Sequence, residues 1–197
     1  MDEHEGYIKF VAHWEKKKFP FEALRIEQIN SIRAELIQKD WVGILPNGIG
    51  FGNISVRNKK GAAFVITGSA TGGLHPLTSK HFALVQTSNV QKNQLSCIGE
   101  TIASSESLSH AVFYKQRKDI QAVIHIHSQQ LWQKQINKLP TSNIKASYGT
   151  PEMAFSISKL LVQHESNSGV FVMGGHPDGL IAFGQNLEEI VQLLLQL

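Results

Sequence analysis

The segment Ala122–His127 constrains the fold of this chain more than any other stretch of its sequence. It begins with an apolar run and ends in two histidines that one isoleucine separates. A short apolar run of this kind is typical of a strand buried in a sheet. Side chains two residues apart on a strand point to the same face, about 6–7 Å apart along the chain. The sequence therefore predicts that His125 and His127 form a rigid pair of imidazoles. The alternative is two incidental histidines at an exposed strand end.

Histidine is abundant and cysteine is scarce, which limits the metal sites that the chain can build. The 197 residues include nine histidines and a single cysteine, Cys97. One cysteine excludes an internal disulfide framework and a cysteine-based zinc finger. A transition metal would therefore be held by imidazole and carboxylate groups. A catalytic zinc site usually has three protein ligands and one open position. After the histidine pair, the candidates for the third ligand are His176 and His110.

The composition favours one globular domain. Hydrophobic residues make up 42% and charged residues 18% of the chain, which excludes a disordered polyelectrolyte. The formal net charge is +3 and the basic residues are dispersed, so no nucleic-acid partner is expected. No apolar run reaches the roughly 18–20 residues that span a bilayer. The N-terminus, Met1–Glu5, is acidic, unlike a secretory signal. We expect a soluble cytoplasmic protein without a membrane partner.

Helix-like and strand-like segments alternate along the chain, which predicts an α/β or α+β domain with a layered sheet. The predicted helices cover residues 22–39, 106–118, 151–164 and the segment from Asn186 to the end. The predicted strands cover residues 53–57, 62–67, 82–87, 122–127, 170–173 and 180–183. The first two strands are expected to form a hairpin around a turn at 58–61. Residues 41–52 and 68–73 are glycine-rich and are predicted to be loops.

A carboxylate and two serines stand where a predicted helix begins. Glu106 is the best candidate for a general acid or base, although glutamate in a first helical turn is also common for stability alone. Either Ser104 or Ser105 is expected to cap the helix. Together with the N–H groups of the helix start, the serines form a candidate anion site. Asn53 and the loop 68–73 would add donors. The loop lacks the spacing of a Walker loop or a dinucleotide fingerprint.

Taken in order, these motifs resemble those of one known family. The series comprises Gly52–Ser55, Ile66–Ser69, Ser104–Glu106, His110, Ala122–Ser128, Tyr148–Glu152, His176, Gly184 and Glu188–Glu189. Its order and spacing, including the 19 residues from Glu106 to His125, are similar to those of the class II aldolase/adducin family. That family contains sugar-phosphate aldolases, epimerases and dehydratases. The resemblance covers about residues 22–195, nearly the whole chain.

The resemblance implies a fold, an assembly and an activity. The fold is a single three-layer α/β/α domain over residues 22–197, whose central sheet is largely antiparallel and covered by helices, after an N-terminal extension at 1–21. The assembly is a homotetramer with active sites at subunit contacts. The activity is that of a zinc-dependent aldolase-type lyase, with Zn²⁺ or another divalent metal, on a small sugar or sugar phosphate. A metal-stabilised enediolate would form when the carbon–carbon bond breaks. An epimerase on the same site and an adducin-like binding protein are the alternatives.

The resemblance also implies roles for individual residues. Glu106 matches the acid/base glutamate of the family aldolases. Three histidines match the zinc ligands, namely His125, His127 and His176. Four polar residues match positions that bind substrate phosphate, namely Asn53, Ser69, Ser104 and Ser105. The chain departs from the pattern in two places. Segment 129–147 has no tyrosine where the aldolases carry a proton donor, and Ala70 stands where the phosphate loop has glycine.

Overall fold

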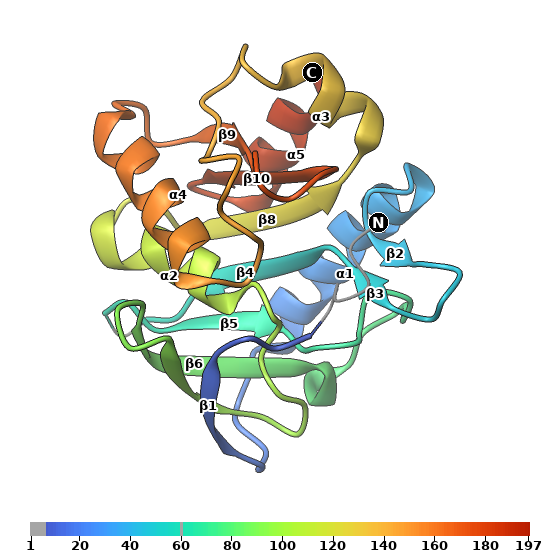
Figure 1. The fold of residues 1–197 in the computed structure, drawn as a ribbon. Coiled ribbons are helices and arrows are strands. Elements are labelled where there is room, and N and C mark those ends of the chain that lie inside the picture. Colours follow the sequence, from blue (N-terminus) through green and yellow to red (C-terminus); the bar gives the residue numbers. More distant parts are fainter. Residues whose placement is uncertain (1–6, 60) are drawn as a thin grey trace.

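An eight-stranded sheet lies at the centre of the computed structural model, which describes residues 7–59 and 61–197 (Figure 1). The strand order is β1-β7-β6-β5-β4-β8-β10-β9. The strands are β1 (Val11–Glu15), β4 (Asn53–Arg57), β5 (Phe64–Thr67), β6 (Phe82–Asn89), β7 (Gln94–Ile98), β8 (Ala122–His127), β9 (Gly169–Val172) and β10 (Gly179–Gly184). All neighbouring pairs are antiparallel except β1 with β7. The prediction of a largely antiparallel central sheet is confirmed.

Helices cover both faces of this sheet and give three layers (Figure 1). Helices α2 (Ser107–Gln116) and α4 (Pro151–Gln163) enclose one core with the first face. Helices α1 (Ala23–Gln38), α5 (Leu187–Leu195) and the short α3 (Gln129–Gln135) pack on the other face. A small hairpin of β2 (Gly43–Ile44) with β3 (Gly50–Phe51) and a 3-10 turn η1 (Ser79–His81) complete the elements. The predicted α/β/α architecture is confirmed.

Strand β8 explains how the sheet orients the histidine pair. Ala122, Ile124 and Ile126 belong to the core under α1 and α5, whereas Val123 belongs to the core under α2 and α4. Because side chains alternate along a strand, the two histidines at 125 and 127 share the face of Val123. This is the face on which α2 begins. The strand therefore aims both imidazoles toward the N-terminal end of that helix.

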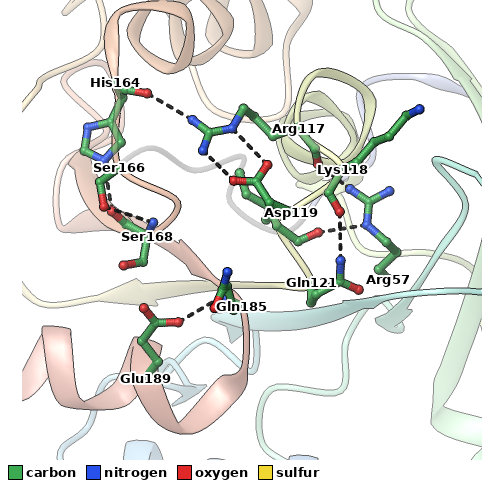
Figure 2. A network of polar contacts seen from close by, with 11 residues as sticks. Arg57, Arg117, Lys118, Asp119, Gln121, His164, Ser166, Ser168, Gln185 and Glu189 are labelled. Atoms are coloured by element: carbon green, nitrogen blue, oxygen red, sulfur yellow. Dashed lines mark hydrogen bonds and ion pairs between the residues drawn. The ribbon is translucent and has the colours of Figure 1, made fainter.

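A polar network anchors the chain where it enters β8 (Figure 2). Arg117 donates two hydrogen bonds to Asp119, at 3.0 and 2.5 Å, and one to the carbonyl oxygen of His164 at 3.0 Å. Arg57 of β4 donates to the carbonyl oxygens of Ile120 and Arg117, at 2.8 and 2.5 Å. These bonds tie the loop between α2 and β8 to β4 and to the end of α4.

The N-terminal segment contributes to the sheet. Residues 1–6 of the expected extension at 1–21 lie outside the described residues, but Val11–Glu15 form β1, which runs parallel to β7. The indole N–H of Trp14 also donates to the carbonyl oxygen of Gly99 at 2.9 Å. The predicted turn at 58–61 includes Lys60, which is outside the described part. Within the described segments, no helix is both long and apolar enough to cross a bilayer.

Candidate metal centre

Three imidazole rings from two segments of the chain meet at one point. His125 and His127 come from β8, and His176 comes from the turn between β9 and β10. The turn reaches the pair because Gly179 of β10 is the register partner of His127. The Nε2 atom of His127 lies 3.1 Å from that of His125 and 3.2 Å from that of His176. One ligand atom from each ring lies within 4.8 Å of the other two.

The geometry of this cluster fits a single metal ion. Zinc–nitrogen bonds are about 2.0–2.1 Å long, so two ligands at a tetrahedral angle lie about 3.3 Å apart. The two Nε2 separations, 3.1 and 3.2 Å, are close to that value. The carbonyl oxygen of Leu180 lies 3.0 Å from Nδ1 of His125. Since a carbonyl only accepts, Nδ1 carries the proton and Nε2 keeps its lone pair for a metal.

Burial keeps the three imidazoles neutral, which is the form that binds a metal. Desolvation lowers the pKa of His125 to about 4, although the hydrogen bond to Leu180 opposes this shift. The pKa of His127 is well below the ordinary value because of burial first and the neighbouring histidines second. The pKa of His176 is also well below it, because of burial, then His125, then Lys9. All three groups therefore offer lone pairs at neutral pH.

Glu106 lines the same pocket as the histidines. Its side chain is 3% exposed, and Ser109 Oγ donates to its Oε2 at 3.0 Å. Glu106 itself is the residue that precedes α2, and its side chain makes no capping hydrogen bond. The expectation that Ser104 or Ser105 caps this helix is wrong. The Ser104 carbonyl oxygen instead accepts from the N–H and the hydroxyl of Ser107, at 3.0 and 2.6 Å, which makes a separate turn before the helix.

The pocket extends from the histidines to the glycine-rich loop. Its walls include all four residues expected to bind phosphate: Asn53, Ser69, Ser104 and Ser105. Asn53 is the register partner of His125 on the neighbouring strand, which places its amide beside the histidines. Its Oδ1 is buried and accepts no hydrogen bond from any described residue. Ala70, with φ of 58°, takes the left-handed conformation that glycine adopts without strain.

Phe51 and Tyr148 line the pocket around the histidines, and Lys9 lies behind Tyr148. The Phe51 ring lies 5.2 Å from that of His127, and the Tyr148 ring lies 4.8 Å from that of His176, between centroids. Lys9 Nζ lies 3.6 Å from the Tyr148 centroid and donates to its carbonyl oxygen at 3.2 Å. No role was predicted for Phe51 or Lys9 from the sequence. Phe51 directly precedes the motif at 52–55, and this position could have predicted that it lies near the site. Nothing in the sequence around Lys9 predicts a place in the site.

His110, the other candidate for the third ligand, lies outside the cluster of three. Its Nδ1 is 2.7 Å from Ser55 Oγ, which is also 2.7 Å from the hydroxyl of Tyr114. Burial, and then His125, keeps the pKa of His110 well below its ordinary value. The network links α2 to β4 inside the core. The structure thus brings His176, and not His110, to the histidine pair of β8.

Comparisons with known proteins place the chain in a family and a fold. Residues 36–197 match the family model described as the Class II Aldolase and Adducin N-terminal domain. A solved structure of L-fuculose 1-phosphate aldolase is 21% identical with a TM-score of 0.64, covering 89% of this chain and 84% of that one. YgbL from Klebsiella pneumoniae, a putative aldolase/epimerase/decarboxylase, is 18% identical with a TM-score of 0.67, covering 90% and 86%. A sugar-phosphate aldolase from Thermotoga maritima is 15% identical with a TM-score of 0.60, covering 89% and 96%. No curated protein matches the chain.

Proposed function

This chain belongs to the class II aldolase and adducin family, and from that premise we propose that it is a metal-dependent aldolase-type lyase. It would cleave or form a carbon–carbon bond in a small ketose, of which a ketose phosphate is the best candidate. One observation carries the proposal: three neutral, convergent imidazoles lie in the same pocket as the buried carboxylate of Glu106. A binding protein without turnover has no need of this combination.

In this proposal, His125, His127 and His176 hold Zn²⁺ or another divalent metal. A bound divalent cation would act as a Lewis acid and stabilise the negative charge that develops on the substrate oxygens. The hydrogen bond from His125 Nδ1 to the Leu180 carbonyl oxygen fixes the orientation of that ring. The ring of Tyr148 packs against that of His176 and so limits the orientations that this third imidazole can take.

Glu106 is the proposed acid and base. After the carbon–carbon bond breaks, its carboxyl group would deliver a proton to the product carbon that was in that bond, and in the reverse direction its carboxylate would remove that proton from the same carbon. The hydroxyl of Ser109 donates to Oε2 and so orients the carboxylate. We propose that the proton moves at Oε1, the other oxygen. Burial of the side chain keeps bulk water away from this transfer.

A phosphate group of the substrate would bind in the same pocket. We propose Asn53, Ser69, Ser104 and Ser105 as its ligands, since all four line the cavity. Asn53 would donate to the phosphate from its amide N–H₂ group, while its buried Oδ1, which accepts no hydrogen bond from any described residue, would accept from a substrate hydroxyl. Binding the phosphate would hold the sugar in one orientation and lower the entropic part of the barrier.

A metal analysis combined with an aldol-cleavage screen tests this function. The purified protein is screened against ketose 1-phosphates and their unphosphorylated forms, and the aldehyde product is measured. Glu106→Gln should keep the metal and lose turnover, whereas Glu152→Gln, a change at an exposed glutamate of α4, should keep both. Full activity in Glu106→Gln would refute the acid/base role. A product that is an epimer of the substrate, with no fragments, would favour the epimerase alternative. Failure to bind any metal after reconstitution would favour an adducin-like binding protein.

We also propose a cytoplasmic homotetramer. We propose that each chain consists of an extension at 1–21 and a catalytic domain at 22–197. The extension adds one strand, β1, to the sheet. The single described cysteine, Cys97, is buried and unpaired, which agrees with a reducing compartment. Light scattering coupled to size-exclusion chromatography tests the assembly. A mass of one chain at micromolar concentration would contradict it.

A further inference from the structure

His110 in α2 is fully buried, and one of its two ring nitrogens has no hydrogen-bond partner in the described part of the chain. Its side chain is 0% exposed. The Nδ1 atom lies 2.7 Å from Ser55 Oγ, and the same oxygen lies 2.7 Å from the hydroxyl of Tyr114. The Nε2 atom makes no hydrogen bond with any described residue. Buried polar side-chain atoms are usually hydrogen-bonded, so a second partner for this ring is expected.

The hydrogen bonds of this buried chain determine which nitrogen of His110 carries the proton. Burial keeps the pKa of His110 well below its ordinary value, so the ring is neutral and has one N–H group. If the Tyr114 hydroxyl donates to Ser55 Oγ, the Ser55 hydroxyl can donate to Nδ1. The opposite direction would leave the buried O–H of Tyr114 without an acceptor among the described residues. The proton of the His110 ring is therefore on Nε2, the nitrogen without a partner.

The position of His110 on α2 brings this Nε2–H group close to the candidate acid and base. Glu106 precedes His110 by four residues, and its carbonyl oxygen accepts from the His110 backbone N–H at 3.1 Å. Side chains at this spacing lie on one face of a helix, with Cβ atoms about 5–6 Å apart. Both side chains are buried, and His125 of the metal cluster contributes to the lowered pKa of His110. The Glu106 carboxylate is thus an acceptor within reach of Nε2–H, directly or through one water molecule.

The Glu106 carboxylate can accept a further donor. An ionised carboxylate has about four lone-pair sites. The hydroxyl of Ser109 occupies one of them, on Oε2 at 3.0 Å. A second donor from the side of His110 would restrict the rotation of the group and still leave a lone pair for the transferred proton. A proton-transfer group held in this way stays within reach of the reacting carbon.

We infer that His110 is a positioning residue whose Nε2–H donates to the Glu106 carboxylate, directly or through one ordered water molecule. Ser55 maintains this donor, because its hydroxyl keeps the ring proton off Nδ1. The inference rests on the proposed function, since it concerns Glu106 as the acid and base. His110 does not line the pocket and does not touch the substrate. Loss of the donor would slow proton transfer and leave metal binding unchanged.

Nitrogen-15 NMR of the zinc-loaded protein, labelled at histidine, tests the proton position and the acceptor. In the wild type, we expect the Nε2 atom of His110 to be protonated and Nδ1 to be unprotonated. Glu106→Gln should shift the Nε2–H proton resonance, because a neutral acceptor replaces a charged one. Glu152→Gln, at an exposed glutamate of α4, should not shift it. A proton on Nδ1, or a resonance that Glu106→Gln leaves unchanged, would overturn the inference.

Two hydroxyl deletions in the buried chain separate positioning from structural support. Ser55→Ala removes the donor to Nδ1, whereas Tyr114→Phe leaves that donor in place. On a ketose that the wild type cleaves, kcat should fall at least about fivefold in Ser55→Ala and stay within about twofold in Tyr114→Phe. KM and zinc content should be unchanged in both. Each variant loses one buried hydrogen bond, so equal losses of kcat would indicate structural support alone and refute the inference.

Substitutions of His110 itself add a test by rescue. His110→Leu removes the donor, and kcat should fall at least about tenfold with zinc content unchanged. His110→Gln places an amide N–H₂ near the position of Nε2, so it should keep at least about a third of the wild-type kcat. Wild-type kcat in His110→Leu would contradict the inference. If His110→Leu does not fold, the comparison of Ser55→Ala with Tyr114→Phe decides.

Failure of the proposed lyase activity would give a different pattern. The expected NMR result, without cleavage of any ketose by the wild type, would refute the activity and leave the hydrogen bond from His110 to Glu106 standing. Ketose cleavage that Glu106→Gln abolishes and His110→Leu leaves at the wild-type rate would refute the inference and leave the activity standing.

Discussion

Acidification should strongly destabilise the metal-free protein, because three buried histidines and one half-buried histidine are neutral in the folded state. The pKa values of these residues are all lowered, first by desolvation: His110, His125, His127 and His176. In the unfolded chain each regains a pKa near 6.5. The unfolded state therefore binds more protons than the folded state as the pH falls below about 6.5. The stability is complete above that pH and is lost progressively toward the folded-state pKa, which is about 4 for His125.

The size of this effect follows from the linkage relation. Each buried histidine that stays neutral at pH 5.5 removes about 1.3 kcal/mol of unfolding free energy between pH 7.5 and pH 5.5. Four such groups remove about 5 kcal/mol, which is comparable with the whole stability of many domains. A bound metal should oppose the loss, because it stabilises only the folded state.

Urea unfolding of the chelator-treated protein at pH 7.5, 6.5 and 5.5, followed by tryptophan fluorescence, measures this loss. His110→Gln should lower the number of protons that the chain takes up on unfolding at acidic pH by about one. His13→Gln, at an exposed position of β1, should leave it unchanged. A loss of less than about 1.4 kcal/mol between pH 7.5 and 5.5, equivalent to about one proton, would refute the reasoning. It would mean that most of these imidazoles are protonated in the folded protein.

Two further substitutions test the walls of the site. Lys9→Met removes a cation from the Tyr148 ring and a hydrogen bond to its carbonyl oxygen, so urea unfolding should show a loss of about 1–2 kcal/mol. Lys16→Met, whose exposed Nζ lies 5.7 Å from an indole ring, should cost under about 0.5 kcal/mol, and an equal cost in both variants would contradict this account. Gly175→Ala would place a Cβ 2.0 Å from the carbonyl oxygen of Ala146, so the histidine that follows must shift. The zinc affinity of Gly175→Ala should fall at least about tenfold in a competition titration. An affinity equal to that of the wild type would show that the turn accommodates the added Cβ without moving His176.

Local patterns in the sequence predicted the histidine pair and six of the eight strands of the sheet, but not β1 or β7. The apolar run at 122–126 predicted a buried strand, and the period of two placed both imidazoles on one face. Helix α1 follows its predicted limits of 22–39 to within one residue at each end. The expectation of Ser104 or Ser105 as a cap failed because Ser107 bonds back to the Ser104 carbonyl and closes a turn first. Hydroxyl groups so close in sequence compete for the same backbone groups.

Other parts of the site depend on contacts between distant segments, which no local pattern reveals. Lys9 reaches Tyr148, 139 residues later, because its carbonyl oxygen accepts from Asn93 and the following strand pairs with β7. Arg33 resembles any other charged residue of an amphipathic helix, and only the packing of α1 under residues 71–74 buries it. The residues alone left His176 and His110 open as the third ligand; the family resemblance favoured His176, and the register between β8 and β10 brings it to the pair.

The metal content of the purified protein tests the central claim most directly. After reconstitution with zinc and removal of the excess, elemental analysis should find about one ion per chain in the wild type and less than about a tenth of that in His125→Ala. His164→Ala is the control, since that imidazole packs against Phe171 and Phe183 outside the cluster. It should keep the wild-type content. Equal metal content in His125→Ala and the wild type, or no bound metal in the wild type, would contradict the account.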